Sequence, residues 1–143
     1  MIYMATLKIS DLSVGDWVRW GERNVQIAEI GQLVYSFGSR KIDFDNRVTL
    51  RYKENIPVYC ESVMLADLEP IPITAEILEK IGFERLLESD LFYHSESGLE
   101  VAFEDGEWMH TINLHEYTIH TISGVHHIQH LLRFYGCEKE INL

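Results

Sequence analysis

Three histidines near the end of the chain are the residues whose type and spacing could support chemistry. The stretch SGVHHIQHLLRFYG, residues 123–136, holds His126, His127 and His130 within five positions. Side chains four residues apart share one face of a helix, so His126 and His130 have the spacing of two zinc ligands. His127 faces elsewhere, and it stands where the HExxH metalloprotease motif requires a glutamate.

A metal site would need further ligands from outside this helix. Neighbouring candidates in the sequence are His115, His120 and Glu116. A metal-dependent hydrolase that uses His115, His120, His126 and His130 is therefore one alternative for function. The other interpretation is a structural helix, in which His126 and His130 lie on the flank of an apolar stripe and are either partly exposed or bonded to a neighbouring carboxylate or carbonyl. A pH response is a further alternative, because imidazole titrates near pH 6.5.

Other catalytic and cofactor motifs are absent from the sequence. It contains no GxSxG nucleophile elbow, no GxxxxGK[ST] phosphate loop and no GxGxxG after a strand. Cys60 and Cys137 are far apart and belong to no CxxC motif, which indicates isolated reduced thiols in a cytoplasmic protein. We therefore expect no catalytic residue, metal or cofactor, and a non-enzymatic protein is favoured.

Charge is distributed unevenly along the 143 residues, which have a formal net charge of −11. Residues 1–70 contain 8 Lys+Arg and 10 Asp+Glu, whereas residues 71–143 contain 4 and 13 and all seven histidines. An acidic surface repels phosphate backbones, so the second half disfavours nucleic acid as a partner. It favours a basic protein partner, and mimicry of DNA charge is one form of this hypothesis. A merely solvated surface is the alternative.

A basic segment in the first half is the sole indication of nucleic-acid contact. It comprises Arg40, Lys41, Arg47, Arg51 and Lys53, with Phe44 and Tyr52 between them. Small β-barrels bind single strands through such grooves, so weak single-stranded nucleic-acid binding is another alternative. Acidic residues interrupt the segment, however, and the aromatic side chains are as well explained as core.

Residues 1–70 have the pattern of short strands and turns. Runs at Asp16–Trp20 and Val25–Ile30 alternate apolar and polar residues across a connection containing Gly21 and Asn24. Further strands are expected in residues 33–39, 41–52 and 56–69, with a hairpin turn at Asp45-Asn46. Five strands without a helix predict a small antiparallel barrel, and LSVGDWVRW resembles the first strand of SH3-like barrels.

Residues 71–143 predict an acidic α+β lobe that begins after Pro70–Pro72. Thr74 is a suitable N-cap for a helix over AEILEKIGF, which Gly82 ends. Three strands of a β-meander follow, with turns at Ser97-Gly98 and Asp105-Gly106. A second helix is expected from an N-cap at Ser123 to Gly136. Its predicted apolar stripe is Val125, Ile128, Leu131, Leu132 and Tyr135. The fold class is thus α+β, with the two halves as separate domains or with one shared core.

Trp17 and Trp20 are candidates for a partner-binding surface. They are three residues apart on an expected strand and should face opposite sides of it. One would then be buried, and the other would be an exposed anchor of the kind common at protein interfaces.

Three segments together resemble a family of small uncharacterised proteins from phages and mobile elements of gut Bacteroides-type bacteria. They are LSVGDWV at residues 12–18, EPIPITAEILEKIGF at residues 69–83, and VHHIQHLLRFYGCE at residues 125–138. In the last segment His126 matches the family pattern, whereas His127 and His130 replace other residues. The resemblance implies one family unit over the whole length and carries no activity with it.

Targeting signals are not expected. The start of the chain lacks a basic leader followed by an apolar run and a cleavage site, and no apolar segment has the roughly 18 residues needed to cross a bilayer. The sequence thus predicts a cytoplasmic protein-interaction module without a membrane segment.

Overall fold

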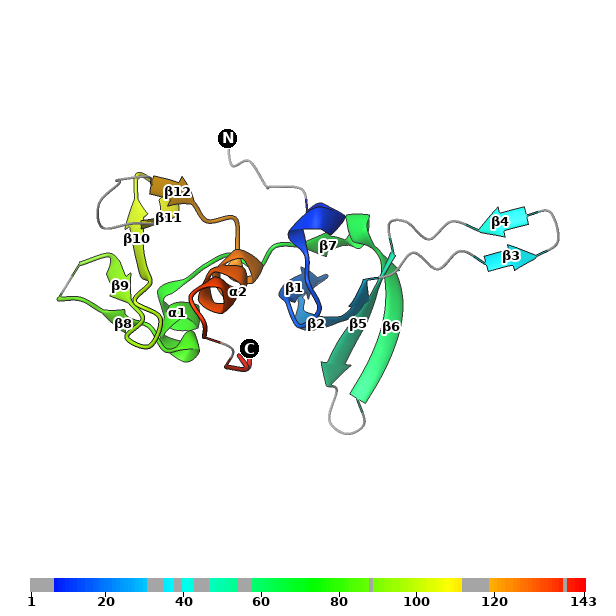
Figure 1. The fold of residues 1–143 in the computed structure, drawn as a ribbon, viewed down its shortest axis with the longest axis horizontal. Helices are drawn as coiled ribbons and strands as arrows, with labels where there is room; N and C mark the ends of the chain where they lie inside the picture. Colours follow the sequence, from blue (N-terminus) through cyan, green and yellow to red (C-terminus); the bar gives the residue numbers. More distant parts are fainter. Residues whose placement is uncertain are drawn as a thin grey trace. The chain divides into compact units, whose positions relative to one another are not determined.

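A computed structural model describes residues 7–30, 35–37, 40–42, 47–53, 58–87, 89–111, 119–137 and 139–143. The fold is α+β, with two five-stranded antiparallel sheets and two α-helices in these residues (Figure 1). The chain divides into two compact units, Met1–Ile71 and Pro72–Leu143, called unit 1 and unit 2.

Unit 1 is built on an antiparallel sheet with the order β6-β5-β2-β1-β7. Its strands are β1 (Trp17–Trp20), β2 (Arg23–Ile30), β5 (Arg47–Lys53), β6 (Val58–Met64) and β7 (Leu68–Glu69). The 3-10 helices η1 (Ile9–Asp11) and η2 (Leu65–Asp67) precede β1 and β7. A second, two-stranded sheet pairs β3 (Tyr35–Phe37) with β4 (Arg40–Ile42).

Asp45 and Asn46, where a hairpin turn is expected, lie outside the described residues. Strand β4 pairs with β3 in the register Phe37↔Arg40, while β5 pairs with β2 and β6. Two residues, Gly38-Ser39, separate β3 from β4, and Gly-Ser is itself a two-residue hairpin sequence.

The hairpin of β1 and β2 is shorter than the sequence suggested. Trp20 lies opposite Arg23, so two residues connect the strands, and Gly21 takes the positive φ of +61° that the turn needs. Asn24, expected in the connection, lies within β2. Val18 and Val25 are directly opposite each other and fully buried, as the alternation predicts.

The LSVGDWV segment is a turn held by a buried carboxylate. The side chain of Asp16 has no exposed surface, and its Oδ2 accepts the Ser13 N–H at 2.8 Å. Gly15, at φ +92°, donates its N–H to the Ile27 carbonyl at 2.7 Å, and Ile27 returns a bond to the Asp16 carbonyl at 2.9 Å. This turn joins the start of β1 to β2.

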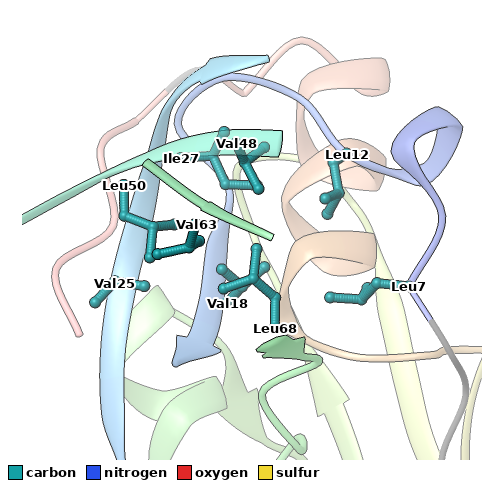
Figure 2. Close-up of a cluster of buried hydrophobic side chains, with 9 residues drawn as sticks. All are labelled: Leu7, Leu12, Val18, Val25, Ile27, Val48, Leu50, Val63 and Leu68. Carbon is teal, nitrogen blue, oxygen red and sulfur yellow. The ribbon is translucent and has the colours of Figure 1, made fainter. Parts of the chain in front are cut away.

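The core of unit 1 is aliphatic. Figure 2 shows its nine side chains: Leu7, Leu12, Val18, Val25, Ile27, Val48, Leu50, Val63 and Leu68. Those on β2 and β5 come from alternate positions, because successive strand residues face opposite sides of a sheet. The register shifts between Ile27 and Glu29, where the alternation of β2 is interrupted.

Unit 2 has a sheet of order β12-β11-β10-β9-β8 with two helices. Its strands are β8 (Glu84–Arg85), β9 (Leu91–Tyr93), β10 (Glu100–Glu104), β11 (Glu107–Thr111) and β12 (Ile119–Thr121). The predicted three-stranded meander is its centre, and β8 and β12 add an edge strand on each side. The core comprises Ile73, Leu78, Phe83, Phe92, Leu99, Val101, Ile122, Ile128 and Leu132.

Helix α1 (Ala75–Ile81) has the predicted boundaries. The Thr74 side chain accepts the Ile77 N–H at 3.2 Å, and Gly82, at φ +110°, ends the helix in a left-handed conformation. Its last turn is closed by the Gly82 and Phe83 N–H groups, which donate to carbonyls of Glu79 and Leu78.

Helix α2 (Val125–Phe134) begins one residue later than predicted. Its N-cap is Gly124, at an extended φ of 163°, and not Ser123. Ser123 instead donates its backbone N–H to Nδ1 of His127 at 3.2 Å. The His127 side chain thus reaches back over the first turn and accepts the N–H of the residue before the N-cap.

Candidate functional site

The histidines of α2 are divided between two directions. The rings of His126 and His130 are 6.1 Å apart and edge-to-face, as expected for side chains four residues apart. The ring of His127 instead lies 5.7 Å from that of His110 on β11, again edge-to-face. One pair of rings therefore lies entirely on the helix, and the third histidine of the helix pairs with a ring of the sheet.

Of the two alternatives for His126, partial exposure does not hold, because its side chain is buried. His126 is 3% exposed and Gln129 6%, in addition to the apolar Val125, Ile128 and Leu132. The buried face of α2 is thus wider than an apolar stripe, because two polar side chains belong to it. His130 is half-buried, as predicted for a flank position.

The other predicted metal ligands are not brought into a described site. His120 lies on β12 opposite His110, and its side chain is not described. His115 and Glu116 lie outside the described residues. Within the described part of the chain, no three His, Cys, Asp or Glu side chains are grouped so as to hold a metal ion. Four imidazoles there lie in two ring pairs, His126 with His130 and His110 with His127, and Nδ1 of His127 accepts the Ser123 N–H.

A buried histidine that the sequence analysis did not single out is His94. It is 4% exposed, and its ring lies 5.1 Å from that of Phe83. Its Nδ1 contacts the Ser97 N–H at 3.2 Å and the Ser97 Oγ at 2.8 Å. Because Nδ1 accepts a backbone N–H, the neutral ring carries its proton on Nε2. Burial is the main cause that lowers the pKa of His94; Glu96 opposes this effect and Lys139 adds to it.

The contact between Ser97 Oγ and His94 Nδ1 has a length found between a nucleophile and its general base. The hydrogen bonds around it, however, stabilise a turn. Ser97 Oγ also accepts the Leu99 N–H at 3.2 Å, and the Gly98 N–H donates to the His94 carbonyl at 2.8 Å. All these bonds lie within residues 94–99, which connect β9 to β10. The sequence signal was the Ser97-Gly98 turn, with a histidine three residues before the serine.

Polar side chains from the end of the chain lie outside this turn. Glu96 forms an ion pair with Lys139, and its Oε2 accepts the Cys137 thiol at 3.7 Å. The bond to Lys139 is the main cause that lowers the pKa of Glu96, and it raises the pKa of Lys139. Cys137 is a free thiol, half-buried beside this pair. The contacts fasten the segment after α2 to the β9–β10 turn.

The two tryptophans of β1 occupy opposite faces of the sheet. Trp20 packs against the core of unit 1, whereas Trp17 alternates with the buried Val18 and is half-buried on the other face. Trp17 lies opposite Gln26, which in turn lies opposite Arg51 of β5.

The basic segment of unit 1 is divided between two sheets. Arg40 and Lys41 are in β4, while Arg47, Arg51 and Lys53 occupy alternate positions of β5. The positions of Arg47 and Arg51 are opposite in phase to the buried Val48 and Leu50, so they belong to the non-core face. Arg51 is exposed and Arg47 half-buried. Phe44 lies outside the described residues.

The acidic side chains of unit 2 are at the surface. All those described are exposed except Glu100, which is half-buried. Two apolar side chains share the end of the sheet with several of them: Leu87 is 92% exposed and Phe103 40% exposed. The acidity followed from composition, but the exposure of Leu87 and Phe103 did not, since both are ordinary core residue types.

Comparisons with protein-family models, with curated proteins and with solved structures found no match to this chain. Among the described helices, none combines the length and the apolarity needed to cross a membrane.

Proposed function

We propose that the chain is a non-enzymatic protein-interaction module whose acidic unit 2 contacts a basic partner protein in the cytoplasm. The observation that supports this most is the exposure of the acidic side chains over unit 2, where residues 71–143 have a net charge of −9. A surface of one charge sign accelerates and orients encounters with a partner of the opposite sign. Its contribution falls as salt screens the charges.

The organisation of unit 1 supports an SH3-like barrel as the second half of the proposal. Its strand order of β7-β1-β2-β5-β6 is that of a meander whose last strand returns beside the first, and η2 directly precedes that last strand. Closure of the sheet into a barrel is part of the proposal. So is an origin in phages or mobile elements, which rests on the resemblance of residues 12–18, 69–83 and 125–138.

Binding of charged peptides to the full chain tests the function. The probes are a fluorescein-labelled peptide of alternating Arg and Gly and one of alternating Glu and Gly, followed by fluorescence anisotropy. We expect the basic peptide to bind, the acidic peptide not to bind, and the affinity of the basic peptide to fall at least tenfold between about 0.05 M and about 0.5 M NaCl. Absence of binding at low salt, or an affinity unchanged by salt, would contradict the proposal.

A further inference from the structure

Two turns of unit 2 lie side by side at one end of its sheet. One connects β8 to β9 and the other connects β10 to β11. The Leu86 N–H donates to the Leu91 carbonyl at 2.8 Å, and the Phe103 N–H donates to the Asp90 carbonyl at 2.9 Å. These bonds extend the ladders of β8, β9 and β10 to the turns. The exposed side chains here form what we call the turn surface: Leu87, Asp90, Phe103, Glu104, Asp105 and Glu107.

The apolar part of the turn surface is unusual for its exposure. Leu87 is 92% exposed and is held at φ +53°, a conformation that residues with a branched side chain seldom adopt. Phe103 is 40% exposed although it is on the same face of β10 as the fully buried Val101. Both side chains therefore offer apolar area at the edge of the core.

Phe103 is the open end of a row of aromatic rings. Its ring lies 5.1 Å from that of Trp108, which lies 5.6 Å from that of the buried Phe92. At the other end of the row, the Arg85 guanidinium carbon lies 5.1 Å from the centre of the Phe92 ring. The chain thus already places one guanidinium over this row, in the geometry of a cation–π contact.

Carboxylates lie on both faces of the sheet at the open end of this row. Asp90 is beside Phe103 across the ladder. Glu104 follows Phe103 and Glu107 precedes Trp108, so both glutamates point to the reverse face of the hairpin. Glu104 and Glu107 are directly opposite each other, an arrangement of like charges that destabilises a hairpin. With Asp105 in the turn, these groups concentrate negative charge at this end of the sheet, so their attraction for a cation adds.

We propose that the turn surface docks an arginine-containing basic segment of a partner protein. The guanidinium stacks on the exposed Phe103 ring close to Asp90, as Arg85 does on Phe92, and the partner's aliphatic atoms cover Leu87. Arginine is preferred to lysine because its planar group stacks on a ring and spans a carboxylate. Bound cations also offset the repulsion between Glu104 and Glu107. This inference rests on the proposed function and names its site.

The test compares two charge-neutralised forms of the full chain. Glu104→Gln/Glu107→Gln changes the turn surface, and Glu76→Gln/Glu79→Gln removes the same charge from the exposed side of α1. Phe103→Leu removes the ring but keeps apolar area. Circular dichroism and thermal melting establish that each variant is folded. The probes are the alternating Arg-Gly peptide and a Lys-Gly peptide of the same length.

We expect Glu104→Gln/Glu107→Gln and Phe103→Leu each to weaken binding of the Arg-Gly peptide by about fivefold to tenfold. The α1 variant Glu76→Gln/Glu79→Gln should weaken this binding by less than about twofold. The Lys-Gly peptide should bind more weakly and respond less to Phe103→Leu. Equal losses in the two glutamine variants would overturn the docking site while leaving the proposed function intact. No binding of either peptide to the unaltered chain would overturn both.

Discussion

One nitrogen atom of His94 links the folding of unit 2 to pH. Nδ1 accepts the Ser97 N–H, and burial lowers the pKa of the ring below its usual 6.5. The unfolded chain therefore takes up a proton near pH 6.5, whereas the folded chain takes it up only at lower pH. Stability from this group is complete above pH 6.5 and is lost as the pH falls from 6.5 through the folded pKa.

His94→Asn should reduce this pH dependence, because the asparagine oxygen can accept the same N–H without titrating. The smaller side chain leaves space beside Phe83, so the variant is expected to lose about 1–3 kcal/mol at pH 7. Urea unfolding at pH 7 and pH 5 measures the difference. His130→Asn is the matched control, and if it flattened the pH profile as much as His94→Asn, the assignment to His94 would be wrong.

Asp16 makes a second prediction at the scale of a single residue. Its buried carboxylate accepts the Ser13 N–H, so Asp16→Ala leaves a partly buried donor without that acceptor. We expect a loss of about 1–3 kcal/mol of unfolding free energy, and a smaller loss for Asp16→Asn, which keeps an oxygen. Asp11→Ala, at an exposed position in η1, should change stability by less than about 0.5 kcal/mol. Equal effects of Asp11→Ala and Asp16→Ala in urea titrations would refute the role of the carboxylate.

Among the elements, the β10–β11 hairpin combines a favourable turn with an unfavourable charge pair. Asp105 and Gly106 have φ of +53° and +80°, which suit a two-residue hairpin, but Glu104 lies opposite Glu107. Glu107→Lys should stabilise unit 2 by about 0.2–1 kcal/mol, measured by thermal melting, and high salt should diminish the gain. Glu79→Lys on α1 is the control, since it makes the same charge change away from the hairpin. A destabilised Glu107→Lys protein would contradict the repulsion.

Elements with local signals were predictable from the sequence, and those defined by pairing were not. Thr74, Gly82 and the Asp105-Gly106 turn act within a few residues, so α1 and this hairpin have the expected places. Strand β12 was missed because three residues carry no pattern and its definition depends on β11. The site followed the same rule: composition indicated an acidic surface, whereas the aromatic row depends on rings from three strands. The spacing of His126 and His130 predicted that their rings are neighbours on the helix, and they are. The burial of His126 depends on tertiary packing, which the sequence pattern does not contain.

At the scale of the whole molecule, the two units differ in their titratable groups. All seven histidines are in residues 71–143, so the folding of unit 1 involves no imidazole. In unit 2, His94 and His110 are buried, and His127 uses Nδ1 to accept a backbone N–H. A proton on the His94 ring places charge in the interior and occupies the lone pair that accepts the Ser97 N–H. The buried side chains form one core within residues 7–68 and another within residues 73–132.

Mild acid should therefore loosen unit 2 before unit 1. Amide hydrogen exchange followed by mass spectrometry, corrected for the intrinsic effect of pH, distinguishes the units in the intact chain. Between pH 7 and pH 5, we expect protection of peptides from β9, β10 and α2 to fall by at least about tenfold, and protection of β1 and β2 to change by less than about threefold. His94→Asn should retain part of the protection of β9 and β10 that the unaltered chain loses. Equal loss in the two units would instead assign the acid response to carboxylates, because these are the acid-titrating groups that both units contain.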